Sequence, residues 1–523
     1  MSQIDYLNTR RLDTGSSAEA RLSPRARAAL LMLAIVLGIG CRLAQYAADR
    51  SYWHDEASLV LNIRNHTARE LTGRLDYEQA APPLFLLAER GVFKLFGGSE
   101  LALRSLPLAC GIAAVLMFAL LARRVVGSPW DVVAVLCFAL SDRLIQHSVE
   151  VKQYGTDAFV AVLLLLLGVG ARANVSATRR MVWVAAVATA AVWFSYSAVL
   201  VFAAISLSLM PAVVGRSLRG GVIYLLCNFP VGVSFLKVLL ASVKAQRDSY
   251  LVNYWNDAFV DFHHPLSIPR WLLHQTHSLA NYAAPAAGPV VLLAMVVGII
   301  ALARAGKMQV LGIVAGPIGM AILAAAAHRY PFDGARLSTY LAASVLLLTA
   351  IGLQWVFDGL AKYIGPWGLV PTGYVLAVAA YWAGLHVIVP RNRGNLRPVA
   401  AYLREHVRAD DGIYALEERE FECYWPAGDP RVRWDMDAAD RVPWKRYWIV
   451  WSFPHDTRLH KLDPMLAWSK QFGVKKDRFQ CPGGLAVLFE KDGREVPAGS
   501  AQPPDVGVEH GVPGGGVRKE RGE

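Results

Sequence analysis

Apolar segments recur along the chain and alternate with short polar connections. Each apolar segment has roughly 15 to 22 residues, which as a helix is enough to cross about 30 Å of hydrocarbon. The segments begin near Ala28, Leu101, Trp130, Asp157, Met181, Ala198, Val222, Pro289, Met308, Leu337 and Trp367. The pattern predicts an α-helical polytopic membrane protein with about eleven transmembrane helices. Composition agrees, because 54% of the 523 residues are hydrophobic and only 18% are charged, too apolar for an ordinary soluble protein.

Basic residues mark alternate connections between these segments. They are Arg10, Arg11, Arg21, Arg25 and Arg27 in the N-terminal tail, and then Arg123, Arg124, Arg172, Arg179, Arg180, Arg216, Arg219, Arg304, Lys307 and Lys362. Cytoplasmic loops hold the excess of Lys and Arg, so residues 1–27 are predicted to be cytoplasmic, and the long connections 49–100 and 241–288 to face outward. This pattern accounts for the net charge of +12. We therefore expect a multi-pass inner (plasma) membrane protein with no nucleic-acid partner.

The composition changes after Pro390. Residues 28–390 hold the predicted spans, whereas 391–491 read as a small extracytoplasmic α/β domain with a helix over 397–408, strands over 412–416, 446–452 and 484–490, and a helix over 461–472. Residues 492–523 are rich in Gly, Pro and charges and are predicted to be disordered. An oxidising compartment would permit a disulfide between Cys423 and Cys481, although the sequence does not show whether the two residues meet.

Charged residues are nearly absent from the middle of the spans. Those that encroach on spans fall near the predicted outer ends, together with loop residues on the same side; the set comprises Asp55, Glu56, Arg104, Asp142, Arg143, Glu150, Lys152, Asp157, Lys237 and Arg336. Transporters tend to place such groups at mid-span. The distribution predicts chemistry at the outer interface. It argues against a lipid or polysaccharide transporter, and a non-catalytic envelope-assembly protein remains the other alternative.

Four short motifs follow one another in a defined order. They are Asp55-Glu56-Ala57 after the first span, Pro82-Pro83-Leu84, the run from Phe93 through Gly97 to Arg104, and Tyr330-Pro331-Phe332 leading to Arg336 and Tyr340. Together they resemble the GT-C superfamily of integral-membrane glycosyltransferases, in the bacterial branch of protein mannosyltransferase-like enzymes and the lipid A aminoarabinose transferase. The resemblance implies a polyprenyl-phosphate-linked sugar donor and an outward-facing active site. The acceptor would be an envelope glycan, lipid or protein.

The resemblance also implies roles for the acidic residues. A sugar phosphate already has a leaving group, so the enzyme needs a base for the acceptor hydroxyl and cations for the departing phosphate. Asp55 matches the first acidic position of the family and is the candidate base; the alternatives are an exposed loop acid or a carboxylate favoured by a helix N-terminus. Glu56 would orient Asp55, bind a metal or be solvated. Asp157 matches a second acidic position, and N-capping of its span is the alternative.

Substrate contacts are predicted from the same outer set. Lys152 and Arg336 are candidates for the donor phosphate, with snorkelling to lipid headgroups as the alternative. Tyr154 is predicted to lie near Asp157 because of its helical spacing. Relatives near the aminoarabinose transferase have Lys before the paired prolines, whereas this chain has Ala81; Gln79 is a candidate neutral substitute or a solvated loop residue. The sequence therefore does not indicate that this chain uses the same donor sugar as the aminoarabinose transferase.

The long connections carry weaker signals. Glu89, Arg90 and Lys94 lie on one arc of a predicted helix, which is typical of a helix in the membrane interface. Connection 241–288 holds Tyr250, Tyr254, Trp255, Phe259, Phe262 and Trp271, which indicate either an interfacial belt or a sugar-stacking surface. His263, His264, His274 and His277 complete no recognisable zinc pattern. No cofactor is required by these patterns, and a divalent metal remains an option.

Overall fold

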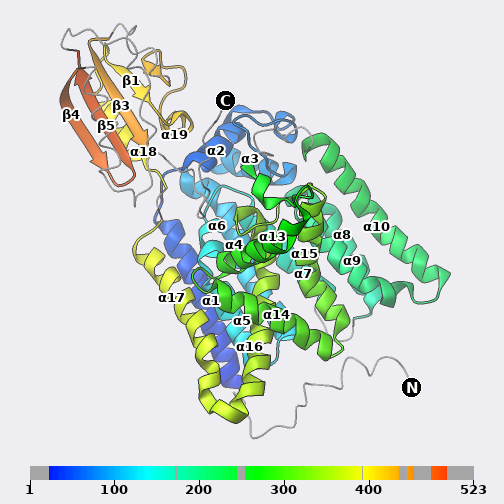
Figure 1. Ribbon diagram of the computed structural model, residues 1–523. Helices are drawn as coiled ribbons and strands as arrows, with labels where there is room; N and C mark the ends of the chain where they lie inside the picture. Colours follow the sequence, from blue (N-terminus) through cyan, green and yellow to red (C-terminus); the bar gives the residue numbers. More distant parts are fainter. Residues whose placement is uncertain are drawn as a thin grey trace. The chain divides into compact units, whose positions relative to one another are not determined.

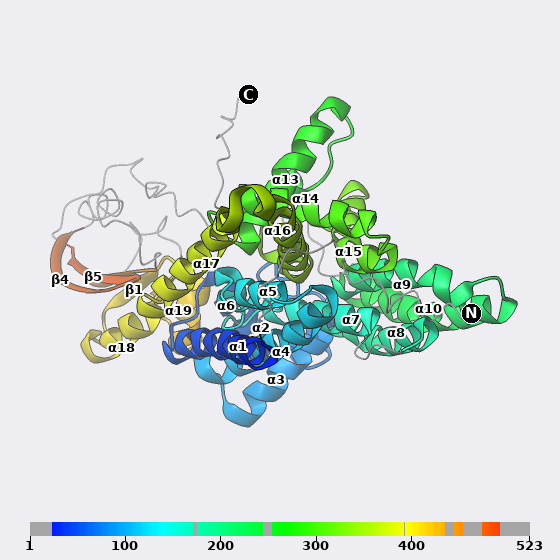
Figure 2. The same cartoon turned by 90° about the horizontal axis from the view of Figure 1, so that it is seen from below.

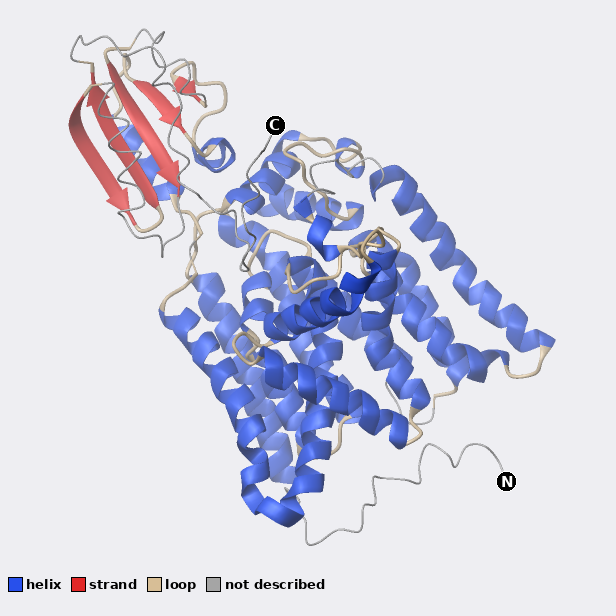
Figure 3. Ribbon diagram, viewed as in Figure 1, coloured by secondary structure: helices blue, strands red, loops and turns tan. Residues whose placement is uncertain are grey.

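The computed structural model describes residues 23–170, 175–243, 254–391, 393–434, 444–452 and 473–491. It is mostly helical, with one small sheet (Figure 3). The chain forms two compact units: Met1–Asp49 with Asn62–Pro390, here called the helical unit, and Arg50–Leu61 with Arg391–Glu523, here called the α/β unit. The predicted cytoplasmic tail up to residue 22, the predicted helix over 461–472 and the predicted disordered tail lie outside the described residues.

Every predicted span has a helical counterpart in the helical unit (Figure 1). These helices are α1 (Pro24–Ala47), α4 (Glu100–Val125), α5 (Trp130–Ala139), α7 (Tyr154–Val169), α8 (Ala177–Phe194), α9 (Ala198–Val214), α10 (Leu218–Val238), α14 (Gly288–Arg304), α15 (Met308–Ala326), α16 (Ala342–Ile364) and α17 (Val370–Ile388). The long connections are structured too, by α3 (Pro83–Phe96), η2 (Glu70–Thr72), η3 (Leu239–Val243), η4 (Asn256–Ala258), η5 (Pro265–Ser267) and α13 (Ile268–Ala283). Segments η6 (Arg336–Leu341) and η7 (Gly365–Leu369) lead into α16 and α17.

Several helices are shorter than the hydropathy pattern predicts. Among the described residues, five helical stretches are long and apolar enough to cross a membrane, or six if the bent pair Pro265–Ala283 and Gly288–Arg304 is one span. Helix α5 has 10 residues, or about 15 Å. The buried Arg42 of α1 caps the end of α5, because its guanidinium donates to the carbonyl of Ala139 at 2.9 Å. The chain then turns into α6 (Asp142–His147).

Glycines allow the helices to pack closely. A Cβ on Gly298 of α14 would lie 2.1 Å from the carbonyl oxygen of Leu348, and one on Gly352 of α16 would lie 1.8 Å from that of Ala294. Across the α9–α15 contact, a Cβ on Gly316 would lie 2.9 Å from the Cβ of Ala204. Close backbone approach of this kind drives helix association where water is absent. Figure 2 shows α8, α9 and α10 side by side, as their mutual contacts require.

One end of the helical unit is basic. Arg27 at the start of α1 donates to Asp131 at the start of α5 at 2.6 Å, and Arg180 of α8 donates to Gln309 of α15 at 2.8 Å. Arg180 also donates to the carbonyl of Gly168 near the end of α7 at 3.0 Å, which places a cation at a helix C-terminus. These contacts join the connections that carry the predicted cytoplasmic basic residues.

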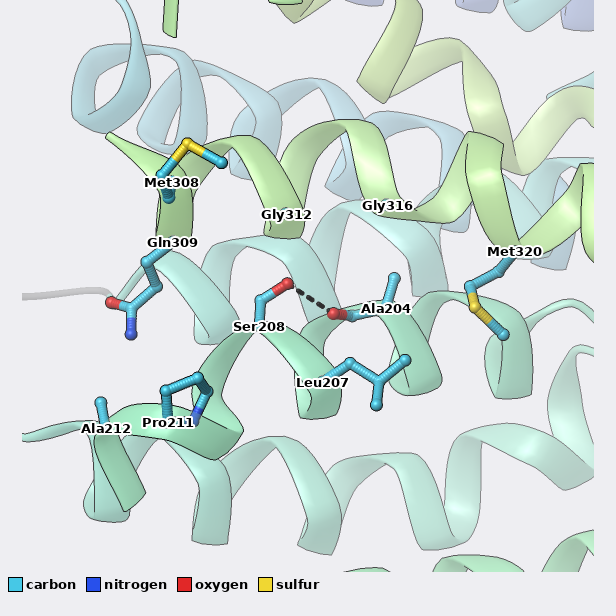
Figure 4. A pocket seen from close by; sticks show the side chains of 10 residues that line it. All are labelled: Ala204, Leu207, Ser208, Pro211, Ala212, Met308, Gln309, Gly312, Gly316 and Met320. Atoms are coloured by element: carbon cyan, nitrogen blue, oxygen red, sulfur yellow. Dashed lines mark hydrogen bonds between the residues drawn. The ribbon is translucent and has the colours of Figure 1, made fainter. Parts of the chain in front are cut away.

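A cavity of about 500 Å³ lies between α9 and α15 (Figure 4). Met308 and Gln309 line it near the basic end, and the lining includes Gly312 and Gly316. The hydroxyl of Ser208 donates to the carbonyl of Ala204 at 2.6 Å. The lining holds no charged side chain, so this cavity lacks the groups that sugar-phosphate chemistry needs.

The opposite end, here called the polar end, gathers other helix termini. Tyr46 of α1 donates to the carbonyl of Leu101 in α4 at 2.7 Å. His386 of α17 lies 2.6 Å from Asp142 of α6. Within the helical unit, this end therefore holds the residues from Asn62 to the start of α4, the α6–α7 connection and the end of α17.

The α/β unit contains a five-stranded sheet of order β2-β1-β3-β5-β4. The strands are β1 (Gly412–Ala415), β2 (Val432–Arg433), β3 (Arg446–Ser452), β4 (Val474–Cys481) and β5 (Gly484–Glu490). Strand β1 is parallel to β2 and β3, and β5 is antiparallel to β3 and β4. Helix α18 (Leu396–His406) buries its apolar face in the same core. The predicted helix over 397–408 and the predicted strands over 412–416, 446–452 and 484–490 are thus confirmed within two residues.

The two cysteines of the α/β unit do not form a disulfide. No disulfide bond joins Cys423 to Cys481. Cys423 belongs to α19 (Glu418–Tyr424), and its Sγ lies 3.9 Å from the carbonyl oxygen of Ala57. The Sγ of Cys481, at the end of β4, lies 3.5 Å from the carbonyl oxygen of Asn395. The pairing that an oxidising compartment would permit is therefore absent.

Candidate active site

The start of α7 clamps the loop that precedes the paired prolines. The ammonium of Lys152 donates to the side-chain oxygen of Gln79, and Gln153 donates to the carbonyl of Ala80 at 3.2 Å. From the other side, the hydroxyl of Tyr196 donates to the carbonyl of Ala81 at 2.9 Å. Lys152 is only 3% exposed, which is unusual for a lysine that merely snorkels to headgroups.

Asp157 lies in the first turn of α7 and is 3% exposed. It does not cap the helix, because Gln153 occupies the N-cap position and Asp157 donates its own N–H to the Gln153 carbonyl at 2.8 Å. The Ser195 side chain hydrogen-bonds the carboxyl group, while Oδ1 has no hydrogen-bond partner among the described residues. A buried carboxylate oxygen of this kind is costly unless a ligand or proton satisfies it.

A close backbone contact fixes the start of α7. A Cβ added at Gly155 would lie 2.7 Å from the carbonyl oxygen of His147, so only glycine fits between α6 and α7 without a shift. Tyr154 packs its ring against that of His147, with centroids 5.0 Å apart. Tyr154 and Asp157 therefore share a rigid turn, as their spacing predicts.

Residues 330–340 lie near the start of α7 at the polar end. Burial and the nearby Asp157 carboxylate raise the pKa of the Tyr330 phenol. The carboxylates of Asp157 and Asp333 also act electrostatically on the Tyr340 phenol. Burial raises the pKa of Asp333 to about 6, with the Arg336 guanidinium acting in the opposite direction. The structure thus brings Asp157 and the Asp333–Arg336 segment to one region.

A hydrogen-bond chain positions Arg336. Thr339 donates to the carbonyl of Arg336 at 2.6 Å, and its Oγ1 lies 2.8 Å from the hydroxyl of Tyr282. Tyr282 lies 2.6 Å from Nε2 of His147, whose Nδ1 is 2.8 Å from Glu150. Because a carbonyl can only accept, Thr339 and then Tyr282 donate along the chain toward Arg336. Glu150 ends the chain on the other ring nitrogen of His147.

The aromatic residues of connection 241–288 pack on the same segment. The Arg336 guanidinium lies 5.9 Å from the ring centroid of Trp255, Trp271 lies 6.1 Å from Phe332, and Phe259 stacks on His328 at 5.2 Å. Three of the predicted aromatic residues thus pack against the segment that carries Arg336. Tyr250 lies outside the described residues.

Asp55 and Glu56 open α2 (His54–Asn65), whose first residues belong to the α/β unit. Asp55 is half-buried and Glu56 buried. The segment before them is anchored within this unit: the backbone N–H of Tyr52 donates to the Tyr424 hydroxyl at 2.6 Å, and Arg393 lies 4.2 Å from the Trp53 ring centroid. Acidic side chains are common in the first turn of a helix, because the helix dipole is favourable for negative charge there.

A polar cluster in the α/β unit was not predicted from the sequence. It consists of His54, Glu417 and Glu420. Burial raises the pKa of Glu420 to about 8, and the neighbouring carboxylates of Glu417 and Glu56 act in the same direction. The residues are too far apart in sequence for spacing to reveal them. The exposed His263 and His264, in contrast, belong to no metal-binding group among the described residues.

The three charged residues predicted to share one arc of a helix have different surroundings on α3. Glu89 is 0% exposed, on the same side of α3 as the buried Phe85. Arg90 instead donates to the carbonyl of Ile63 at 2.7 Å. Helix α3 packs against α4 and α8, so its charged arc is divided between protein contacts and the exposed Lys94.

No protein-family model matches the chain, and no curated protein matches it. Among solved structures it is similar to the Archaeoglobus fulgidus oligosaccharyltransferase in complex with Zn and sulfate, at 12% identity, a TM-score of 0.49, and coverage of 88% of this chain and 72% of that one. It is also similar to ArnT from Cupriavidus metallidurans bound to undecaprenyl phosphate, at 14% identity and a TM-score of 0.47, with coverage of 91% of this chain and 99% of that one. A third similar structure is the arabinofuranosyltransferase AftD from Mycobacteria, at 14% identity and a TM-score of 0.46, with coverage of 91% of this chain and 40% of that one. With TM-scores below 0.5, these likenesses assign neither fold nor activity by themselves.

Proposed function

We propose that this protein is an inverting membrane glycosyltransferase that moves a sugar from a polyprenyl phosphate to an envelope glycan, lipid or protein acceptor. The observation that carries the proposal is the burial of both Lys152 and Asp157 around the N-terminus of α7, at the polar end of an otherwise apolar helical unit. A helix N-terminus and a buried cation together favour a bound phosphate. The ordered sequence motifs point to the same chemistry.

In the proposed reaction, Asp55 accepts the proton of the acceptor hydroxyl. The acceptor oxygen attacks the anomeric carbon on the face opposite the phosphate, and a new glycosidic bond forms as the carbon–oxygen bond to phosphate breaks. The bonding electrons leave with the polyprenyl phosphate, whose charge Lys152 and Arg336 stabilise. Glu56 orients Asp55, Asp157 and Tyr154 contact the sugar, and Gln79 holds Lys152 in position.

The proposal places the polar end and the α/β unit on the outer side of the inner membrane. The basic connections would then face the cytoplasm. Reporter fusions after Arg64 and Arg397 should show extracytoplasmic activity, and fusions after Arg124 and Arg180 should show none. Activity on the cytoplasmic side after Arg397 would contradict this arrangement.

Lipid mass spectrometry of a deletion strain tests the activity itself. Loss of the transferase should cause a polyprenyl-phosphate sugar to accumulate and the corresponding glycosylated acceptor to disappear. Purified protein should restore the product when given that lipid. A strain that retains the product and accumulates no such lipid would overturn the proposal.

A further inference from the structure

Three metal-ligating side chains meet inside the α/β unit. They are His54 at the start of α2, Glu417 just before α19 and Glu420 within α19. Their ligand atoms all lie within 4.8 Å of one another, and Nδ1 of His54 is 3.6 Å from Oε2 of Glu417. One imidazole and two carboxylates thus converge from two segments that are distant in sequence.

Glu420 points into this cluster from a buried position. It is 3% exposed. The side chain of Ser452 and the backbone of His54 hydrogen-bond its carboxyl group, while Oε2 has no partner with good hydrogen-bond geometry among the described residues. The backbone of Gly394 covers it on one side, since a Cβ there would lie 2.7 Å from that oxygen. A buried carboxylate oxygen without a well-formed hydrogen bond is costly, and a bound cation would satisfy it.

The charge around Glu420 also favours a cation. Glu417 and Glu56 both act on it electrostatically, so three carboxylates gather near His54. Arg419 contributes a cation at this cluster: its Nη1 donates to Nε2 of His54 at 3.0 Å and to the hydroxyl of Ser58 at 3.3 Å.

We propose that His54, Glu417 and Glu420 bind one divalent transition-metal ion of the zinc type. Imidazole and carboxylate ligands suit Zn²⁺, whereas Mg²⁺ prefers oxygen ligands and keeps its water. Ligand atoms about 2.0 to 2.2 Å from a common ion would lie closer together than the present separations, so binding contracts the cluster by about 1 Å. The ion would hold the start of α2, immediately before Asp55.

Arg419 competes with the metal in this arrangement. A guanidinium can only donate, so Nε2 of His54 accepts and the ring proton lies on Nδ1 in the metal-free state. Coordination through Nδ1 moves the proton to Nε2, and Arg419 must withdraw. Arg419→Gln would supply an amide oxygen that accepts from Nε2–H, the outer-sphere partner that metal-bound histidines usually have.

The test measures zinc bound to the full-length protein in detergent after removal of metal with EDTA. Wild type, Glu420→Gln and His54→Gln are compared by elemental analysis and calorimetry, with Glu418→Gln as the matched control because Glu418 is exposed on the same helix. Wild type and the control should bind one more equivalent of Zn²⁺ than the other two variants. Arg419→Gln should bind it about tenfold more tightly, and Mg²⁺ should not compete.

Equal zinc stoichiometry in wild type and in both ligand variants would overturn the proposal. If Glu420→Gln fails to fold, as judged by gel filtration, His54→Gln decides the question. Competition by Mg²⁺ at similar concentration would refute a zinc-type site. Sugar transfer is not part of these measurements, so they decide on the metal site whether or not the protein is a glycosyltransferase.

Discussion

The ammonium of Lys152 donates a hydrogen bond to the side-chain oxygen of Gln79, which joins the start of α7 to the loop before α3. The neutral amide orients the lysine without neutralising it. Gln79→Glu would place a carboxylate against the ammonium, so we expect the KM for the donor to rise at least about tenfold, as loss of a charge-assisted contact would cause. Steady-state kinetics with the lipid donor measure this.

The matched control is Gln309→Glu, which changes an amide that accepts from a cation, Arg180, at the basic end. Its KM should equal that of wild type. A Gln79→Glu variant with an unchanged KM would remove Lys152 from the donor-phosphate site.

The guanidinium of Arg336 distinguishes phosphate binding from headgroup anchoring. Arg336→Lys keeps the charge but loses the fork that binds two phosphate oxygens and the planar contact with Trp255. We expect kcat/KM to fall at least about tenfold, the loss of one to two charge-assisted hydrogen bonds. Arg329→Lys, an exposed position on the same segment, should remain fully active. Full activity of Arg336→Lys would favour snorkelling.

Asp333 should make stability depend on pH. Its folded-state pKa of about 6 lies above the ordinary value of 3.8, so the folded state favours the protonated form. The wild type should lose stability relative to Asp333→Asn as pH rises from about 4 to about 6, and the difference should be constant above that. Thermal unfolding of both proteins between pH 4 and 8 measures it. A difference that does not vary with pH would show that burial does not disfavour the ionised form.

Gly155 should be intolerant of a side chain. Gly155→Ala would press a Cβ against the His147 carbonyl, and overpacking of this kind costs about 1 to 3 kcal/mol. Gly232→Ala is the control, because nothing lies within 4 Å of a Cβ at Gly232 in α10. Thermal unfolding should show a lower Tm for the first variant only. Equal melting of the two variants would refute a tight α6–α7 contact.

Periodicity predicted the positions of the helices well because hydropathy reports directly on burial in lipid. It could not predict the length of α5, whose last carbonyl accepts a hydrogen bond from the distant Arg42. It grouped Glu89 with Arg90 and Lys94 but could not show that Glu89 is buried, because an amphipathic pattern does not distinguish lipid headgroups from a neighbouring helix such as α4. The proximity of Lys152 to Gln79 and of His54 to Glu420 arises from tertiary contacts, which spacing along the chain cannot encode.

The candidate site likewise combines residues that spacing along the chain predicts with residues that only the fold brings together. Tyr154 and Asp157 could be paired from helical spacing alone, whereas the chain from Glu150 through His147 and Tyr282 to Thr339 joins α6, α13 and η6. The roles of Asp55, Glu56, Asp157 and the phosphate-binding cations stay predictions, because they depend on a substrate as well as on the fold.

The central claim is that Asp55 is the general base. Asp55→Asn keeps the size of the side chain and its place in the first turn of α2, but the neutral amide cannot take up the acceptor proton. A positioned base contributes about 10² to 10⁴-fold to rate. Glu56→Gln should have a smaller effect, because in the proposed mechanism Glu56 only orients its neighbour. Asp76→Asn is the control, since the Asp76 side chain is 66% exposed.

The most direct measurement is therefore single-turnover sugar transfer by purified wild-type, Asp55→Asn and Asp76→Asn proteins, each matched for membrane level and donor binding. The account predicts that Asp55→Asn binds the polyprenyl-phosphate sugar normally and transfers it at least about 100-fold more slowly, while Asp76→Asn transfers at the wild-type rate. Transfer by Asp55→Asn at the wild-type rate would contradict the proposed mechanism.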